Sequence, residues 1–354
     1  MAASFVHQVS ELIERLNLNY VRRELKPVFS TSVKSKREFI EEVAANAPLS
    51  AELQSRLLSL GALSCHLGSR QLEVFKVSDA STKKRLNAFF QNAEITKQKL
   101  LLGQFPFSIE DSEELRALKK SEIHILERGD ITFKDKEYNF MLVSSVAEKE
   151  VKTVGTEYLT EEGLEYLEEN NASVYVYSTR KVQLFHSLYW HADSDELLIS
   201  VDRSKLSMSD SQDQLFMIRG MLSKEVISVG DPLNVFGAIE PLYNDVDGYV
   251  VKLGHVTTQS NPVRLTLKGA EKCLKKDRYH NSGESGGHVA GKFSVSKRWS
   301  LRDENENNFN IEVELYGKPA MLDTAQPLTD FAVIKCLRIE DLNFAIQNVS
   351  PHSS

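Results

Sequence analysis

The sequence predicts a multi-domain α+β protein, in which an all-helical N-terminal domain precedes two related mixed α/β units. Three observations favour this fold class. Helix-period apolar stripes with capping residues fill the first hundred residues, strand-like alternation begins near residue 109, and a set of anchor residues then recurs in the same order. Each unit is expected to be mainly an antiparallel sheet with short helices. The length of 354 residues suits two or three domains of about 150 residues each.

The first helix is predicted from an apolar stripe at helical spacing, which consists of Phe5, Val9, Leu12 and Leu16. Ser4 precedes this stripe and can cap the helix by accepting a hydrogen bond from a free backbone amide. The segment 35–38 has the sequence Ser-Lys-Arg-Glu and is a capping box, which predicts the start of a second helix.

Pro48 is expected to end that second helix, since proline removes a backbone donor and clashes with the preceding turn. Ser50 then caps a third helix, whose inward face carries Leu53, Leu57 and Leu60. Gly61 is expected to stop this helix, because glycine readily adopts the left-handed conformation that follows many helices.

A longer helical pattern runs from Ser81 to Leu102 and would place five cations on its exposed side. They are Lys83, Lys84, Arg85, Lys97 and Lys99. Residues 1–108 hold 15 Lys and Arg against 10 Asp and Glu, whereas the remaining residues hold 28 against 40. A basic N-terminal domain on an acidic body indicates an anionic partner such as nucleic acid, and the alternative is a solvated helix face.

The body is interpreted as two copies of one unit, residues 109–205 and 206–320. In each copy a helix (112–119 and 211–222) leads to a strand (122–126 and 226–229), and a tyrosine, Tyr138 or Tyr249, opens the next strand. A Leu-Thr-x-x-Gly sequence ending in Gly163 or Gly269 then starts a short helix (160–170 and 266–276). Trp190 and Trp299 lie on the last strand but one.

These anchors predict that the tryptophans and tyrosines fill the space between each sheet and its covering helix, and that the glycines allow close packing. Two unrelated α+β domains that share these features by chance remain the alternative. A winged helix would need helices before each Leu-Thr-x-x-Gly segment, where strands are expected instead. Residues 321–354 are predicted to form a C-terminal strand (331–334) and a polar tail.

The segment 283–287 reads Gly-Glu-Ser-Gly-Gly and fits the pattern of a nucleophile elbow. That chemistry needs the serine at a strand–turn–helix apex, beside a histidine and an acid. Here the segment is expected between a helix and a strand, so the preferred interpretation is a flexible Gly/Ser loop.

A second pattern, Asp135 followed by Glu150 and Lys152, fits the D…E-x-K arrangement of restriction-endonuclease-like nucleases. In those enzymes two carboxylates hold Mg²⁺ beside the scissile phosphate and the lysine orients the attacking water. A solvated hairpin is the alternative interpretation.

His186 and His191 flank Trp190, but residues five apart on a strand face opposite sides, so no metal site is predicted there. The chain has no phosphate-binding loop of the G-x-x-x-x-G-K-[ST] type, no G-x-G-x-x-G and no H-E-x-x-H. Its three cysteines, Cys65, Cys273 and Cys336, lack CxxC spacing. No cofactor is therefore expected, apart from Mg²⁺ under the nuclease hypothesis.

The favoured function is that of a non-catalytic cytosolic interaction or assembly subunit, which binds a protein partner or self-associates. One alternative is a nucleic-acid-binding protein that acts through the basic N-terminal domain, and another is the metal-dependent nuclease. No membrane partner is expected, because the longest stretch without a charged residue is 13 residues. The expected location is cytoplasmic.

Overall fold

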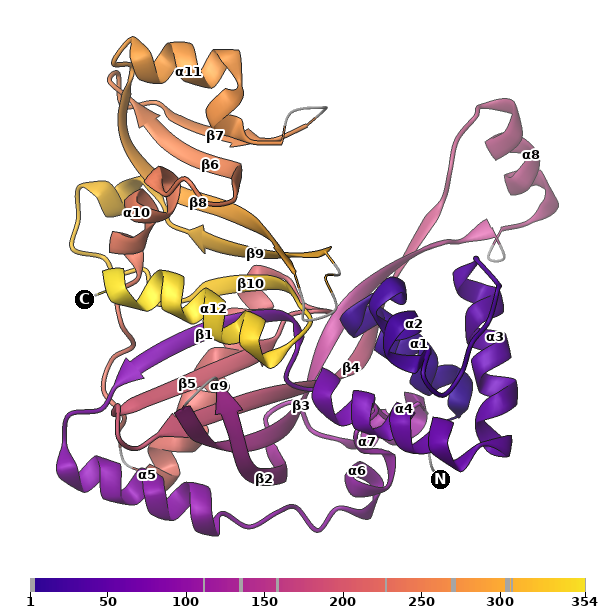
Figure 1. Cartoon of the computed structure of the whole chain (residues 1–354). Helices are drawn as coiled ribbons and strands as arrows, with labels where there is room; N and C mark the ends of the chain where they lie inside the picture. The colour runs from indigo at the N-terminus through magenta and orange to yellow at the C-terminus, as the bar shows by residue number, and fades with distance from the viewer. Residues whose placement is uncertain are drawn as a thin grey trace.

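A ten-stranded antiparallel sheet runs through the computed structural model (Figure 1), which describes residues 4–110, 112–133, 136–156, 159–226, 228–268, 272–302, 306 and 308–353. The order of the strands is β2-β3-β4-β5-β1-β10-β9-β8-β6-β7. Their bounds are β1 Gly68–Lys76, β2 His124–Phe133, β3 Lys136–Val154, β4 Tyr175–His191, β5 Glu196–Asp202, β6 Tyr249–Thr257, β7 Pro262–Thr266, β8 Val289–Arg302, β9 Asn308–Tyr316 and β10 Phe331–Cys336.

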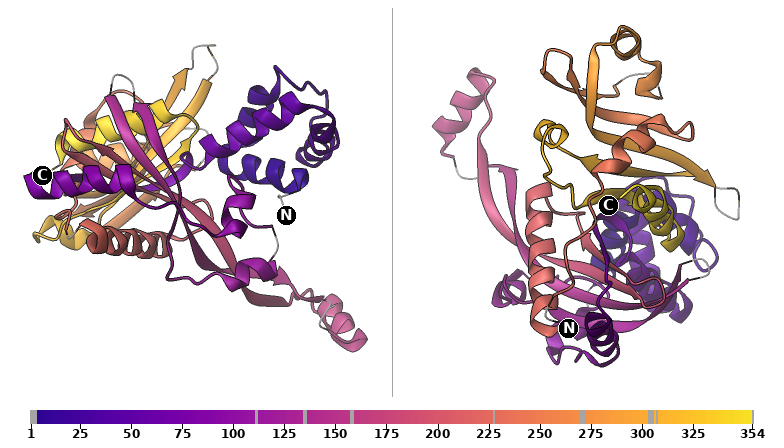
Figure 2. Two further views of the ribbon diagram at one scale, coloured as in Figure 1. Left: turned by 90° about the horizontal axis from the view of Figure 1, so that it is seen from below. Right: turned by 90° about the vertical axis from the view of Figure 1, so that its left-hand side faces the viewer.

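Helices cover both faces of this sheet and extend from its edges (Figures 1 and 2). Their bounds are α1 Phe5–Leu16, α2 Leu18–Leu25, α3 Lys36–Asn46, α4 Ala51–Ser64, α5 Ala80–Asn92, α6 Lys99–Gln104, α7 Ser112–Ala117, α8 Glu161–Glu169, α9 Met208–Val226, α10 Ile239–Asn244, α11 Arg278–Ser285 and α12 Ile339–Val349. The mixed α/β class is thus confirmed. Nowhere in the described part of the chain does a helix combine the length and apolar composition that crossing a bilayer requires.

The prediction of an all-helical N-terminal domain is wrong, because residues 68–76 form β1 near the middle of the sheet. β1 pairs with β5 from Arg70–Asp202 to Lys76–Glu196, and with β10 on its other side. The charged residues of β1 break the apolar–polar alternation that is typical of a half-buried strand, so the sequence does not predict this strand. Glu73 is nevertheless only 2% exposed. Long-range pairing on both sides, rather than local pattern, makes it a strand.

The helix starts of the N-terminal segment follow the predicted caps. Ser4, Ser35 and Ser50 each accept a hydrogen bond from the amide three residues on, at the starts of α1, α3 and α4. Gly61 does not end α4, which continues to Ser64. A Cβ at Gly61 would lie 2.7 Å from Pro106 Cγ, so this glycine serves the close approach of another segment.

The predicted helix 81–102 is also wrong, because it is divided into α5 and α6. Asp79 caps α5 by accepting from the amide of Thr82, and the helix ends at Asn92. Between the two helices the amide of Thr96 donates to the carbonyl of Ile125 in β2. This backbone contact with a distant strand replaces the helical hydrogen bonds there.

Four further expectations fail in the second half of the chain. The strand expected at 226–229 is not found in its described residues, because Val226 lies in α9 and residues 228 and 229 belong to no strand. Thr266 lies in β7 rather than starting a helix. The Gly/Ser segment 283–287 is not a loop throughout: α11 runs to Ser285, capped by Asp277. The polar tail contains α12, which buries Ile339, Leu342, Ala345, Ile346 and Val349.

The two predicted units contain comparable meanders, β3-β4-β5 and β6-β8-β9, each interrupted by a helix between its first and second members. Trp190 on β4 donates to Asn87 of α5, and Trp299 on β8 packs edge-on against Phe344 of α12. The tryptophans therefore lie between sheet and helix as expected, but the covering helices come from outside the two units. The duplication itself stays a prediction.

The other anchors differ from expectation. Tyr138 is buried and Tyr249 half-buried. Gly163 lies in α8, and the nearest atoms to a Cβ there belong to Leu159 (3.4 Å) and Thr160 (3.6 Å) of the same segment, so this glycine serves no packing of a helix on the sheet. Gly269 lies outside the described residues.

The middle of the sheet, at β1 and β5, is buried on both faces, and β1 contributes to both cores. Leu72 and Val74 belong to the core under α1–α4 and α12, whereas Phe75 belongs to the core under α5 and α9. Every residue of β5 is buried for the same reason. All three cysteines are buried and free.

A buried guanidinium, Arg70, lies at the centre of this arrangement. It is 1% exposed and donates to the hydroxyl and carbonyl of Ser200 (3.0 and 3.2 Å) and to the carbonyl of Phe185 (3.0 Å). Burial alone would raise the pKa of the neighbouring Asp202, but Arg70 and Arg15 hold it below its ordinary value. The two cations thus keep that buried carboxylate charged.

Replacing Arg70 by methionine should lower the free energy of unfolding by about 3–5 kcal/mol, because it leaves Asp202 short of a partner in a buried site. Chemical denaturation followed by circular dichroism measures this change. The matched control is Arg37→Met, which removes an exposed guanidinium paired with Glu41 and should leave the free energy of unfolding nearly unchanged. Equal losses in the two variants would contradict the assigned role of Arg70.

Candidate functional site

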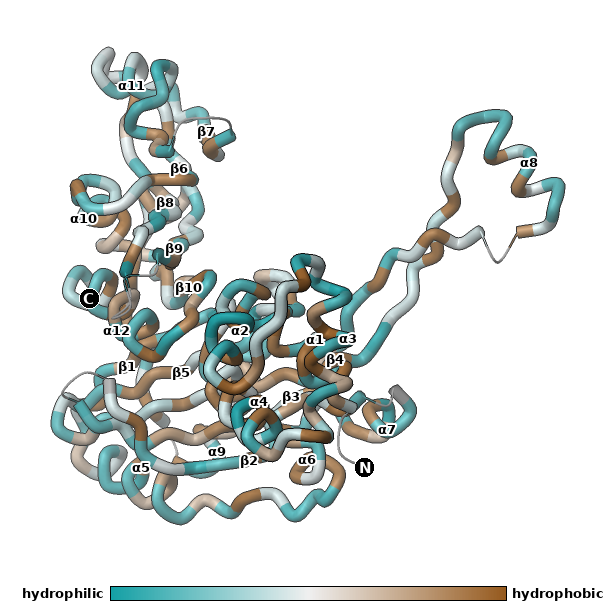
Figure 3. The backbone as a smooth tube through the Cα atoms, turned by 45° about the vertical axis from the view of Figure 1, so that its right-hand side comes forward, coloured by the Kyte–Doolittle hydropathy of each residue, from teal (hydrophilic) through white to brown (hydrophobic). Residues whose placement is uncertain are grey.

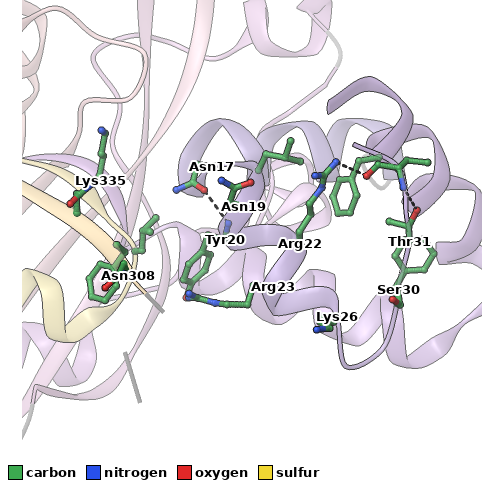
Figure 4. A pocket seen from close by; sticks show the side chains of 17 residues that line it. Asn17, Asn19, Tyr20, Arg22, Arg23, Lys26, Ser30, Thr31, Asn308 and Lys335 are labelled. Carbon is green, nitrogen blue, oxygen red and sulfur yellow. Dashed lines mark hydrogen bonds between the residues drawn. The ribbon is translucent and has the colours of Figure 1, made fainter. Parts of the chain in front are cut away.

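A cleft of about 1020 Å³ opens between the N-terminal helices and the strands β9 and β10 (Figure 4). One wall is α2 with the chain that follows it to Val33, and the other is formed by the start of β9 and the end of β10. The sequence segments that meet here are 17–39, 308–310 and 335–337. The cleft exists only because β10 places residue 335 beside the N-terminal helices.

Four cationic side chains line the cleft, and the described lining contains no Asp or Glu. The cations are Arg22, Arg23, Lys26 and Lys335. Apolar and aromatic side chains are interspersed with them, namely Leu18, Tyr20, Phe29, Val33, Phe39, Phe309 and Leu337. A positively charged surface with apolar side chains between the cations is suited to an anionic ligand that also carries apolar groups.

Arg22 builds one wall of the cleft. Its guanidinium lies 5.0 Å above the ring of Phe39 and donates to the carbonyls of Val33 (2.9 Å) and Lys34 (2.8 Å). Its Nε is buried and has no hydrogen-bond partner among the described residues. This side chain therefore holds the segment 26–35 against α2 while one donor stays unused.

Tyr20 and Arg23 form the adjacent part of the wall. The Arg23 guanidinium lies 4.9 Å from the centre of the Tyr20 ring, and its Nε is 3.4 Å from a carboxylate oxygen of Glu24. Burial, reinforced by Glu24, raises the pKa of Tyr20 to about 12, so its phenol keeps its proton. The wall therefore offers donors and positive charge.

Two residues of the cleft have a left-handed backbone although neither is glycine: Asn17 (φ 79°) and Lys335 (φ 63°). Asn17 joins α1 to α2 and caps α2 by accepting from the amide of Tyr20. Residues other than glycine in this region cost free energy and cluster at functional sites. Lys335 is the exposed cation on the strand side of the cleft.

A second feature is the arm, which we define as residues 148–181: the distal parts of β3 and β4 with α8 at the tip (Figures 1 and 3). The two strands pair to their ends, with Val154 opposite Tyr175. α8 reads Glu-Glu-Gly-Leu-Glu-Tyr-Leu-Glu-Glu and has no buried side chain. Large apolar or aromatic side chains stay exposed along the arm: Val154, Leu164, Tyr166, Tyr175 and Tyr177.

The basic surface predicted from the sequence does not form the cleft. Lys83 pairs with Asp195 at 2.7 Å and Lys97 pairs with Glu94. Lys84 and Arg85 are exposed on α5, and Lys99 opens α6, so one helix does not carry all five cations as predicted.

The residues of the nuclease hypothesis lie on the arm as far as they are described. Glu150 and Lys152 are exposed on β3, and the Lys152 ammonium lies 3.6 Å from the centre of the Tyr175 ring. Asp135 lies outside the described residues. The nuclease hypothesis thus stays a prediction.

His186 and His191 form hydrogen bonds to different residues. His186 contacts the hydroxyl of Ser145 at 2.8 Å and accepts from the amide of Asp202, and burial lowers its pKa to about 3. His191 accepts from the amide of Ser194. Within the described ranges no three His, Cys, Asp or Glu side chains are grouped so as to hold a metal ion.

The sequence reasoning missed every cation of the cleft. A signal was present for three of them, because Arg22, Arg23 and Lys26 lie within one helical turn. Nothing in the sequence could place Lys335 beside them, since that contact depends on the pairing of β10 with β1.

The replacement Arg22→Gln should loosen the wall formed by residues 26–35, because Gln reaches fewer of the carbonyls that the guanidinium holds. Hydrogen–deuterium exchange should become at least threefold faster at residues 31–36 and stay unchanged in β1. Lys36→Gln, an exposed change at the start of α3, is the control. Unchanged exchange at 31–36 would show that Arg22 does not hold this segment.

Comparison with known proteins adds no relative from which this cleft or this arm could be interpreted. No protein-family model matches the chain, and no curated protein matches it in sequence.

Proposed function

We propose that the chain is a self-associating assembly subunit, in which the arm of one copy docks into the cationic cleft of a second copy. The observation that carries this proposal is the opposite charge of two uncovered surfaces. α8 has five glutamates and no Lys or Arg, whereas the described cleft lining has four cations and no carboxylate. Oppositely charged surfaces attract each other during encounter and fix the register of docking.

The dimensions and chemistry of the two surfaces also match. A nine-residue helix is about 13.5 Å long and about 10 Å wide, which corresponds to the 1020 Å³ of the cleft. Leu164 and Tyr166 of α8 are exposed and can contact the apolar side chains between the cations, such as the half-buried Phe29. Docking would thus bury apolar surface as well as pair charges.

The shape of the chain favours a second copy as the occupant. The arm extends away from the body in both views of Figure 2, with α8 at its far end. A two-stranded ribbon has little stability of its own, and an exposed aromatic ribbon is typical of an element that packs on a partner. Reciprocal exchange of two arms would give a closed twofold dimer with two identical contacts.

The charge test uses two variants of the full chain. The arm variant carries Glu161→Lys, Glu165→Lys and Glu168→Lys, and the cleft variant carries Arg23→Glu, Lys26→Glu and Lys335→Glu. We expect the parent to have the mass of a dimer in light scattering at 50 mM salt and to dissociate at 1 M salt, because salt screens exposed charges. Each variant alone should be monomeric at both salt concentrations.

Mixing the two variants should restore the dimer, since each arm then meets a cleft of opposite charge in both contacts. The control variant Lys84→Glu, Arg85→Glu, Lys99→Glu reverses three cations away from the cleft and should dimerise like the parent. A parent that stays monomeric at 100 µM and low salt, or a mixture that stays monomeric, would overturn the proposal.

A second candidate function is the binding of single-stranded nucleic acid in the same cleft. The specific observation that favours it is the combination of four cations with the half-buried ring of Phe29, since cationic grooves hold phosphates and aromatic rings stack bases. Fluorescence anisotropy with a labelled oligonucleotide distinguishes the two candidates. Binding that the cleft variant loses and the arm variant keeps would assign the cleft to nucleic acid.

A further inference from the structure

A cluster of polar side chains is buried between α9 and the middle of the sheet. Gln71 and Glu73 of β1 belong to it, as does Asp330, the residue before β10, and these three are 0%, 2% and 8% exposed. Gln212 and Arg219 reach the same place from α9. We call these five side chains the α9 cluster. None of them belongs to the arm or lines the cationic cleft.

The two carboxyl groups of the α9 cluster are neighbours across antiparallel chain segments. Leu72 pairs with Phe331, so Glu73 and Asp330 are the next residues along the two segments. Gln71 and Glu73 are two residues apart on one strand and share a face, and the Gln71 amide donates to Asp330 on that face. Two carboxylates in one buried site repel each other, so one of them holds a proton to a higher pH than usual.

The hydrogen bonds of the α9 cluster serve Asp330 and leave Glu73 short. Both oxygens of Asp330 accept, one from the amide of Gln71 and the other from the amide of Gln212 at 3.2 Å. Oε2 of Glu73 is buried and accepts no hydrogen bond from the described residues. Nε of Arg219 lies 3.6 Å from it, which is too long for a hydrogen bond. Glu73 is therefore the carboxyl of the pair that holds the proton.

The surrounding charges do not offset the burial of Glu73. The charged groups that face it are Arg219 of α9 and Asp330, and Asp330 is faced in turn by Arg219 and Arg203. Arg203, between β5 and α9, also lies 3.8 Å from Glu314 of β9, so it is shared between carboxylates. Burial, reinforced by Asp330 and opposed by Arg219, raises the pKa of Glu73 to about 7.

We propose that the α9 cluster makes the docking of α9 pH-sensitive: α9 stays packed on the sheet while Glu73 is protonated, and it separates more readily once Glu73 is ionised. A protonated carboxyl is a donor, which suits a site where Oε1 of Gln71 is a buried acceptor without a hydrogen bond from the described part of the chain. An ionised Glu73 repels Asp330 and keeps only the long contact with Arg219. Its proton passes to the solvent, and separation of α9 lets water reach the carboxylate.

Separation of α9 would uncover an apolar surface. Leu215, Ile218, Leu222 and Val226 form the buried side of this helix and pack in one core with Phe75 of β1. The pH near neutrality would thus control how often this surface is exposed. The device does not depend on the docking of the arm proposed above, because the two share no residue.

The direction of the pH dependence follows from the raised pKa of Glu73. The carboxyl binds its proton more tightly when α9 is packed than when it is open, where the pKa is near the ordinary 4.5. The packed form is therefore favoured most at low pH, and this advantage is lost as the pH rises from 4.5 to about 7. Between pH 5.5 and 7.5 the equilibrium constant for opening should rise roughly 20-fold.

Hydrogen–deuterium exchange of the full chain at pH 5.5 and 7.5 tests this proposal. Each rate is divided by the intrinsic rate at the same pH, so that the ratio reports the opening constant. We expect the ratio to rise at least tenfold in α9 and to stay unchanged in α4. Glu73→Gln should abolish the rise in α9. The matched control Glu225→Gln removes an exposed carboxylate from α9 and should behave like the parent.

Carboxyl ¹³C NMR of the folded parent measures the proton directly, since the glutamate signal that Glu73→Gln lacks belongs to Glu73. We expect this signal to titrate near pH 7. Asp330→Asn is a second variant, and it should lower the pKa of Glu73 and move the rise in α9 exchange to lower pH. A Glu73 carboxyl that is ionised by pH 5, or a rise in α9 exchange that persists in folded Glu73→Gln, would overturn the proposal.

Discussion

The continuity of the ten-stranded sheet depends on β1, which hydrogen-bonds to β5 on one side and to β10 on the other. The strand comes from the N-terminal part of the chain, whereas its neighbours come from residues 196–202 and 331–336. It also brings Arg70 into the interior, where the guanidinium bonds to Ser200 and to the carbonyl of Phe185. Removing this strand would divide the sheet into two separate meanders and expose both cores.

β1 also fixes where the N-terminal helices lie. Gly68, with φ +90°, begins the strand, and a Cβ there would be 3.0 Å from the carbonyl oxygen of Arg15 in α1. Helix and strand therefore touch through their backbones, which only glycine allows at this φ. Since β10 pairs with the same strand, Lys335 comes close to α2, and the cationic cleft follows from the sheet order.

Short sequence patterns predicted where helices start, but they did not predict contacts between segments that are distant in the sequence. The caps Ser4, Ser35, Ser50 and Thr160 could be recognised because a cap depends only on the three or four residues that follow it. The break between α5 and α6 could not be recognised, because its cause is a backbone bond from Thr96 to β2. The cleft shares this difficulty, because it joins segments whose proximity is decided by strand order.

The described surfaces of this chain carry opposite charges in different places, so the charge of the whole chain is a poor guide to partners. The net charge of −7 combines the five glutamates of α8 with a cleft whose described lining has four cations and no carboxylate. Fields of exposed charges decay within about 8–10 Å at physiological salt, so a ligand responds to its own lobe and not to the sum. An acidic chain can therefore present a cationic cleft, because the sheet holds the cleft and the acidic helix α8 in separate places.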